Sequence, residues 1–141
     1  MSTTMQEKPS FSYISEALIN KRQKLLIKFC ELAGLEPYSQ TEPLAIELKQ
    51  FCQLLMDYSA LCHFELFEGI INDPNTSDAV NQAVNQGYPR IKIITNKAVD
   101  FNDNYAELKN IQINRLSSDL SKLGEELAVC FEIEDRLLAM L

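Results

Sequence analysis

The sequence predicts an all-α protein, an up-down four-helix bundle with one additional short helix. Apolar residues recur at three- and four-residue spacings, which is the period of an amphipathic helix. The 141 residues include only four glycines and five prolines, and no alternating strand pattern competes with the helical one. Four long amphipathic segments joined by short connections pack most simply as a bundle around one core. We expect residues 10–141 to form this single domain and residues 1–9 to form a flexible N-terminus.

The first helix is expected to begin at Ser10 or Ser12, since either serine can cap a helix start. Gly34 and Pro37 end it, and a polar loop follows through Gln40. Its apolar stripe consists of Ile14, Leu18, Leu25, Phe29 and Leu32.

The second helix is predicted to run unbroken from Pro43 to Ile71. Thr41 is suited to cap it, and Pro43 fits the first turn because proline needs no hydrogen-bond acceptor there. The segment Asn72-Asp73-Pro74-Asn75 ends it. Its stripe consists of Leu44, Leu48, Phe51, Leu55, Tyr58, Cys62 and Leu66.

The second half of the chain is predicted to hold a short helix over Ser77–Gln86 and then two long ones. Gly87 and Pro89 separate the short helix from the third long helix, whose stripe consists of Ile91, Ile94, Ala98, Phe101 and Tyr105. The last helix carries Leu116, Leu120, Leu123, Leu127, Cys130, Leu137 and Leu141 on one line, with Glu134 on the same line. We expect Leu48, Phe51, Leu55, Leu120, Leu123 and Leu127 to lie in the core.

The four cysteines are scattered and form no C-x-x-C pair. Cys30, Cys52, Cys62 and Cys130 are therefore expected to be small buried hydrophobic residues. A zinc site normally has closely spaced cysteine and histidine ligands, and the chain has one histidine. The sequence predicts no metal site and no cofactor.

No stretch approaches the roughly 20 apolar residues that cross a bilayer. The first ten residues, MSTTMQEKPS, lack the basic and apolar regions of a secretory signal. We therefore expect a cytoplasmic protein without a membrane partner.

The net charge of −7 is unevenly distributed along the chain. Residues 30–89 carry nine acidic residues and a single basic one, Lys49. Direct nucleic-acid binding is disfavoured, because phosphate contacts need clustered Lys and Arg. An acidic surface suits a basic protein partner, but a solvated helix face kept acidic for solubility explains the charge equally well.

The chain also lacks the residues of a catalytic bundle. A di-iron centre needs two Glu-x-x-His motifs, and the one histidine, His63, follows Ala60 at that spacing. His63 and Asp57 are too few for acid–base catalysis. Glu134 and Asp135 are expected to be a partly buried carboxylate and its exposed neighbour in a bundle salt bridge. We predict a binding protein rather than an enzyme, with a metal-binding bundle enzyme as a remote alternative.

Two stretches resemble the Rsd/AlgQ family of anti-sigma factors. They are FCQLLMDYSALCHFELFEGII, residues 51–71, and LSKLGEELAVCFEIEDRLL, residues 120–138. Arg22, Leu25, Leu26, the turn Ala33-Gly34-Leu35-Glu36-Pro37 and the pair Tyr88-Pro89 extend the resemblance over most of the chain. The chain departs from the family pattern at Ser59-Ala60-Leu61-Cys62 and in having no tryptophan.

The resemblance implies a regulator that binds the primary sigma factor of bacterial RNA polymerase and sequesters it from core enzyme and promoter DNA. The implied contact is the C-terminal helix-turn-helix region of sigma, and a second sigma region is left open. The same family leaves an alternative, a signalling adaptor that binds a phosphocarrier or an alarmone-metabolising protein.

The expected partner-binding residues centre on Asp57 and Phe64. They lie seven residues apart and so project from the same side of a continuous helix, off the core line. The match to the family pattern adds His63 and Phe67 as neighbours, and Arg22 from the first helix. The alternative is that Asp57 pairs with a base on an adjacent helix and Phe64 fills the core.

Overall fold

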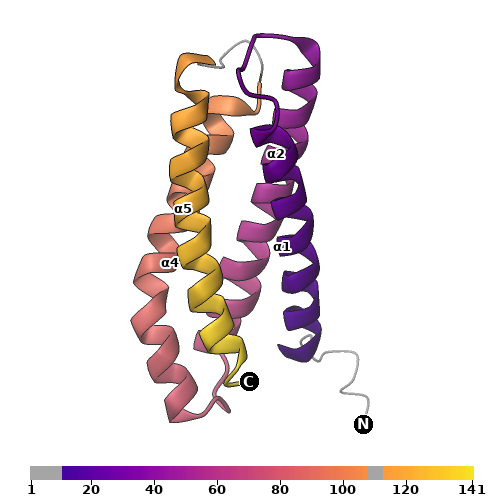
Figure 1. Ribbon diagram of the computed structural model, residues 1–141. Coiled ribbons are helices and arrows are strands. Elements are labelled where there is room, and N and C mark those ends of the chain that lie inside the picture. Colours follow the sequence, from indigo (N-terminus) through magenta and orange to yellow (C-terminus); the bar gives the residue numbers. More distant parts are fainter. Residues whose placement is uncertain (1–10, 108–112) are drawn as a thin grey trace.

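The structure is a computed structural model that describes residues 11–107 and 113–141. These residues form helices and no strand: α1 (Phe11–Ala33), α2 (Glu42–Ala60), η2 (Leu61–Phe67), α3 (Glu68–Ile71), α4 (Asp78–Tyr105) and α5 (Ile113–Leu138). The long helices run alternately up and down, and the described chain begins and ends at the same end of the bundle (Figure 1). The predicted all-α bundle is confirmed.

The start of α2 follows the predicted chemistry. Thr41 lies outside the helix in an extended conformation, and its hydroxyl accepts a hydrogen bond from the Leu44 amide at 3.4 Å. Pro43 occupies the first turn. The expected flexible residues 1–9 and the side chains of Ser10 and Ser12 lie outside what the structure describes.

The second helix reaches Ile71 without a break, as predicted, but it does not keep one hydrogen-bond register. The chain stays helical, but η2 is a π-helix, and the amide of Glu68 bonds to the carbonyl of His63, five residues back. The buried residues Tyr58, Cys62, Leu66 and Ile70 recur at a constant spacing of four. The wider turn of a π-helix keeps that spacing on one face, whereas an α-helix rotates it steadily away.

The third helix is continuous through Pro89, so the predicted separate helix over Ser77–Gln86 was wrong. Ser77 caps the start of α4 by accepting a hydrogen bond from the amide of Val80. Gly87 is needed for packing rather than for a break, because a Cβ there would lie 2.8 Å from Cγ2 of Ile133 on α5. The proline removes one hydrogen bond from the helix. Close packing of α4 against α5 outweighs these two local helix-breaking signals.

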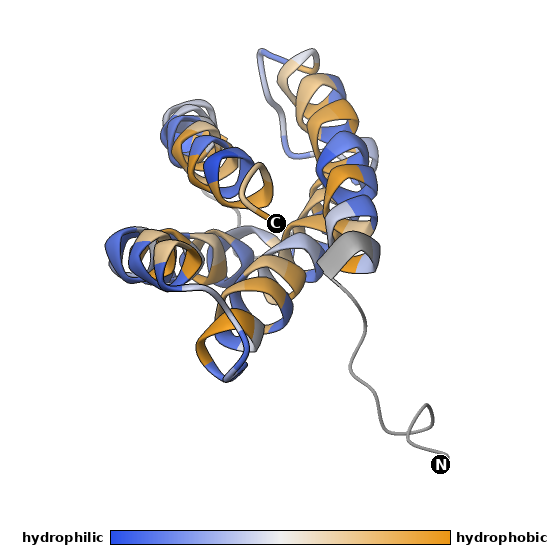
Figure 2. Ribbon diagram, turned by 90° about the horizontal axis from the view of Figure 1, so that it is seen from below, coloured by the Kyte–Doolittle hydropathy of each residue, from blue (hydrophilic) through white to orange (hydrophobic). Residues whose placement is uncertain are grey.

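The core runs along the whole bundle. α1 packs mainly on α2, and α4 packs on both α2 and α5. Seen along the bundle, hydrophobic segments turn inward and hydrophilic segments outward (Figure 2). All six residues predicted for the core are buried: Leu48, Phe51, Leu55, Leu120, Leu123 and Leu127.

Two expectations about single side chains can be compared with the structure, the burial of the cysteines and that of Leu141. Cys52, Cys62 and Cys130 are buried as predicted, but Cys30 is exposed. Leu141 lies beyond the end of α5 and is exposed, so its predicted place on the apolar line was wrong.

Within residues 11–107 and 113–141, no helix is both long and apolar enough to span a membrane.

Candidate functional site

An exposed aromatic side chain marks the outer face of η2. Phe64 is 56% exposed, although it belongs to a helix with a well-packed inner face. Its ring stacks on the imidazole of His63, with 4.6 Å between the ring centres. Phe64 therefore does not fill the core, and it offers an apolar surface already supported from one side.

His63 is held between η2 and α4 by hydrogen bonds at both ring nitrogens. Nδ1 lies 3.0 Å from the Thr95 hydroxyl, and Nε2 lies 3.1 Å from the Tyr88 hydroxyl. Tyr88 donates its own proton to Glu68 at 2.8 Å. His63 must then donate from Nε2, and in the neutral imidazole Nδ1 accepts from the Thr95 hydroxyl. Burial, together with the bond to Glu68, raises the pKa of Tyr88 to about 12, so the donor is retained at neutral pH.

Asp57 lies one turn before η2 and is partly exposed. Its carboxylate accepts a hydrogen bond from the side chain of Gln53, one turn earlier, at 3.0 Å. Among the described residues it makes no ion pair with a base on a neighbouring helix. Its charge is therefore not neutralised within this part of the chain.

Phe67 occupies a different position from the one expected for a partner contact. It is fully buried, and its ring lies parallel to that of Tyr88 at 6.1 Å. The π-helical register turns Phe67 inward, together with Leu66. The expectation that Phe67 is a surface neighbour of Phe64 is corrected: it supports the Tyr88 side of the network from the core.

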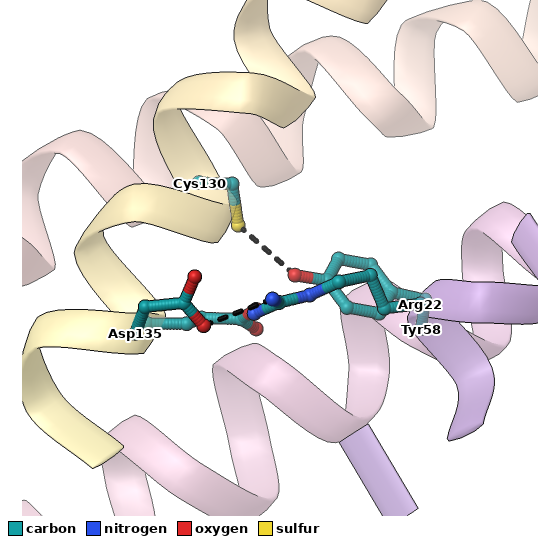
Figure 3. A network of polar contacts seen from close by, with 5 residues as sticks. Arg22, Tyr58, Cys130 and Asp135 are labelled. Atoms are coloured by element: carbon teal, nitrogen blue, oxygen red, sulfur yellow. Dashed lines mark hydrogen bonds and ion pairs between the residues drawn. The ribbon is translucent and has the colours of Figure 1, made fainter. Parts of the chain in front are cut away.

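Arg22 belongs to a second polar network, which joins α1, α2 and α5 (Figure 3). Its guanidinium pairs with Glu134 at 2.7 Å and with Asp135 at 2.9 Å, and lies over the ring of Phe131. Glu134 is fully buried and Asp135 is 61% exposed. Glu134 was expected to be partly buried and is fully buried, Asp135 is exposed as expected, and Arg22 pairs with both. Arg22 itself is only 16% exposed.

The same network contains two thiols. The hydroxyl of Tyr58 lies 3.5 Å from Sγ of Cys130 (Figure 3). The neighbouring thiol of Cys130 and burial together raise the pKa of Cys62. Among the described residues, Cys62, Cys130 and Glu134 are the one group with the donor atoms to hold a metal ion. The group contains no histidine, so it does not match a di-iron centre.

Sequence reasoning missed the connections more than the residues. The position of Glu134 on the apolar line of the last helix was a usable signal, because a charge on that line must be compensated. Its pairing with Arg22, 112 residues away, depends on how α1 and α5 meet. The role of Tyr88 as the link between His63 and Glu68 had no local signal.

Comparison with known proteins gives a consistent family. The family model described as "Regulator of RNA polymerase sigma(70) subunit, Rsd/AlgQ" matches residues 2–141. Similar proteins named "Regulator of sigma D" occur in Enterobacter sp. (strain 638) and Yersinia pestis. The first is 32% identical over 126 residues, covering 86% of this chain and 76% of the relative. The second is 30% identical over 125 residues, covering 85% and 74%.

No solved structure matches the chain significantly. The family model nevertheless covers almost every residue, including both stretches that resembled the family in the sequence. The chain therefore belongs to the Rsd/AlgQ family.

Proposed function

We propose that this chain regulates transcription by binding the primary sigma factor and keeping it from core RNA polymerase and promoter DNA. The family description and the names of the relatives support this function. The proposal implies a protein that works in the cytoplasm, where sigma and polymerase meet.

The observation that carries the proposal is the exposure of Phe64. Aromatic side chains are enriched in protein interfaces, and Phe64 is a large aromatic side chain that the bundle leaves exposed. Here the ring is already stacked on His63, whose two nitrogens are both hydrogen-bonded. A contact residue with little freedom loses little entropy when it binds.

Charge gives the second argument. The helical segment from Glu42 to Glu68 carries five acidic residues and one basic residue, Lys49. The C-terminal region of sigma, a basic helix-turn-helix that reads promoter DNA, has the complementary charge. We propose that Asp57 supplies a charged contact in addition to the apolar contact of Phe64, a combination suited to an interface hot spot.

The other expected residues have supporting roles in this proposal. His63 fixes the ring of Phe64, and Phe67 packs beneath the same network. Arg22 has most of its surface covered and compensates the charge of Glu134. We assign it the alignment of α1 with α5 rather than a direct contact.

A competition experiment tests the function. Purified full-length chain is added to the primary sigma factor before core polymerase, and holoenzyme formation is measured by gel filtration. We expect a complex of the chain with sigma, and less holoenzyme as the chain is increased. Binding to the isolated C-terminal region of sigma should account for most of the affinity.

The same preparation separates the alternative. A phosphocarrier protein is offered to the chain in place of sigma. If the chain binds the phosphocarrier and leaves sigma free to join core polymerase, the signalling-adaptor alternative replaces our proposal.

A further inference from the structure

Two thiols and a carboxylate meet inside the bundle at the level of η2. Cys62 lies on η2, and Cys130 and Glu134 lie one turn apart on α5. All three side chains are buried, and their ligand atoms lie within 4.8 Å of one another. We propose that these three residues form a binding site for a thiophilic divalent cation, with zinc as the expected occupant.

The distances between the three donor atoms would suit zinc after a small movement of the side chains. A tetrahedral zinc ion with Zn–S bonds near 2.3 Å holds its sulfur ligands about 3.8 Å apart. The three donors are already gathered within an ångström or so of that spacing. Two thiolates with one carboxylate are ligands that favour zinc over calcium or magnesium, which prefer oxygen alone.

An unpaired atom in the cluster provides independent support. Oε1 of Glu134 accepts the Arg22 guanidinium, but Oε2 is buried without a hydrogen-bond partner among the described residues. Leaving a buried polar atom without a partner is unfavourable. A cation bound at Oε2 would remove that cost.

The charges also balance. Binding Zn²⁺ releases the two thiol protons of Cys62 and Cys130 and leaves two thiolates and one carboxylate, a total of −1 with the metal. The guanidinium of Arg22, bonded to Glu134, brings the buried group to neutrality. Charges buried in a protein are normally paired or coordinated to a metal in this way.

Solvent is close to one side of the cluster. Arg22 bridges the buried Glu134 and the exposed Asp135, so a single guanidinium separates the group from the surface. The Tyr58 hydroxyl lies 3.5 Å from Sγ of Cys130, at the edge of the cluster. A bound ion would join η2 to α5.

Cobalt titration tests the site on the reduced, chelator-treated full chain. Co²⁺ substitutes for zinc and gives intense near-ultraviolet absorption only when thiolates bind it. We expect one Co²⁺ per chain with thiolate absorption, and its displacement by Zn²⁺. Zn²⁺ should also raise the melting temperature of the wild-type protein.

The variants Cys62→Ala, Cys130→Ala and Glu134→Gln should each lose most of this binding, with circular dichroism reporting whether they fold. The matched controls are Cys52→Ala, a buried thiol outside the cluster, and Cys30→Ala, the exposed thiol. Both controls should bind as the wild type does. Should a ligand variant fail to fold, the wild-type stoichiometry and the zinc-dependent melting temperature still decide.

Three results would overturn the proposal. The first is no thiolate absorption at one equivalent of Co²⁺. The second is absorption that survives in Cys62→Ala/Cys130→Ala or is lost in Cys30→Ala. The third is a Cys62–Cys130 disulfide in the freshly purified protein that forms in preference to metal binding.

Discussion

Arg22 on α1 and Glu134 on α5 form a 2.7 Å ion pair inside the bundle, although 112 residues separate them in the sequence. Glu134 is fully buried, and burial is the main influence on its pKa, which is raised despite the guanidinium. A buried ion pair rarely adds much stability compared with two apolar side chains, but a single unpaired charge is costly. The pair therefore fixes how α1 meets α5 more than it strengthens the fold.

Removing Arg22 should show that an unpaired buried charge costs more stability than the ion pair contributes. Arg22→Met puts an apolar side chain of similar length in place of the arginine. It should lower the free energy of unfolding by about 3 to 5 kcal/mol, because Glu134 loses its partner. Arg22→Met/Glu134→Leu should regain most of the loss. Chemical denaturation measures both variants. The exposed pair Arg136–Glu132 is the control, and Arg136→Ala should cost less than about 0.5 kcal/mol. An Arg22→Met variant as stable as Arg136→Ala would contradict this account.

Periodicity in the sequence predicted the long helices and most of their buried residues, because the apolar stripe of a helix can be recognised within that segment alone. The same reasoning placed Glu134 on a buried line and put Phe64 outside the core. Contacts between helices could not be predicted from periodicity. Gly87 and Pro89 are residue types that often end a helix, and the sequence alone does not show that α4 continues through them while packing on α5.

The packing role of Gly87 against Ile133 can be tested directly. In an open helix, Gly→Ala stabilises by about 1 kcal/mol. At Gly87 the added Cβ would lie 2.8 Å from a methyl group of the stiff, β-branched Ile133. We expect Gly87→Ala to destabilise the protein by roughly 1 to 2 kcal/mol. Thermal denaturation of a double-mutant cycle checks this: in an Ile133→Ala background the same change should be neutral or stabilising. Equal effects in both backgrounds would show that Ile133 is not the cause.

The register shift at Leu61 had a signal that was easy to overlook. Tyr58, Cys62, Leu66 and Ile70 keep a spacing of four, where an α-helical stripe alternates three and four. That pattern is consistent with a wider turn, but four positions are too few to require it. The orientation of Phe67 depends on this shift, which explains why its burial was not predicted.

Glu126 should give the protein a pH-dependent part of its stability. It pairs with Lys97 at 2.8 Å and with Arg90 at 2.7 Å, and the hydrogen bond from Lys97 is the main cause that lowers its pKa. A lowered folded-state pKa stabilises the protein above the unfolded-state pKa, and this contribution is lost as pH falls through the folded-state value. Glu126→Gln should therefore cost about 1 kcal/mol at pH 7 and nothing in strong acid. Urea denaturation from strong acid to pH 7 measures the free energy of unfolding of both proteins.

The neighbouring, exposed Glu125 provides the control for that series. Glu125→Gln changes the same charge and should cost less than about 0.5 kcal/mol at pH 7. A Glu126→Gln deficit that persists unchanged in strong acid would mean that packing, rather than the ion pairs, accounts for it.

The helical segment from Glu42 to Glu68, which we call the acidic segment, should affect how fast sigma binds. We expect the association rate with the C-terminal region of sigma to fall as salt rises, because the Debye length shortens to about 10 Å at 0.1 M. The dissociation rate should change less, since steering acts before contact. Stopped-flow fluorescence at several salt concentrations gives both rates. An association rate independent of salt would remove the proposed role of the acidic segment.

The central claim is that Asp57 and Phe64 contact the primary sigma factor, and the affinity of Phe64→Ala for sigma tests it most directly. Titration calorimetry should show a loss of about 2 kcal/mol, roughly 30-fold in Kd, as for a hot-spot aromatic, and Asp57→Ala should also weaken binding. Ile27→Ala, which removes an equally exposed apolar side chain from α1, should bind normally. All three variants should melt near the wild-type temperature. Sigma binding that survives both Phe64→Ala and Asp57→Ala, or weakens only in proportion to lost stability, would contradict the claim.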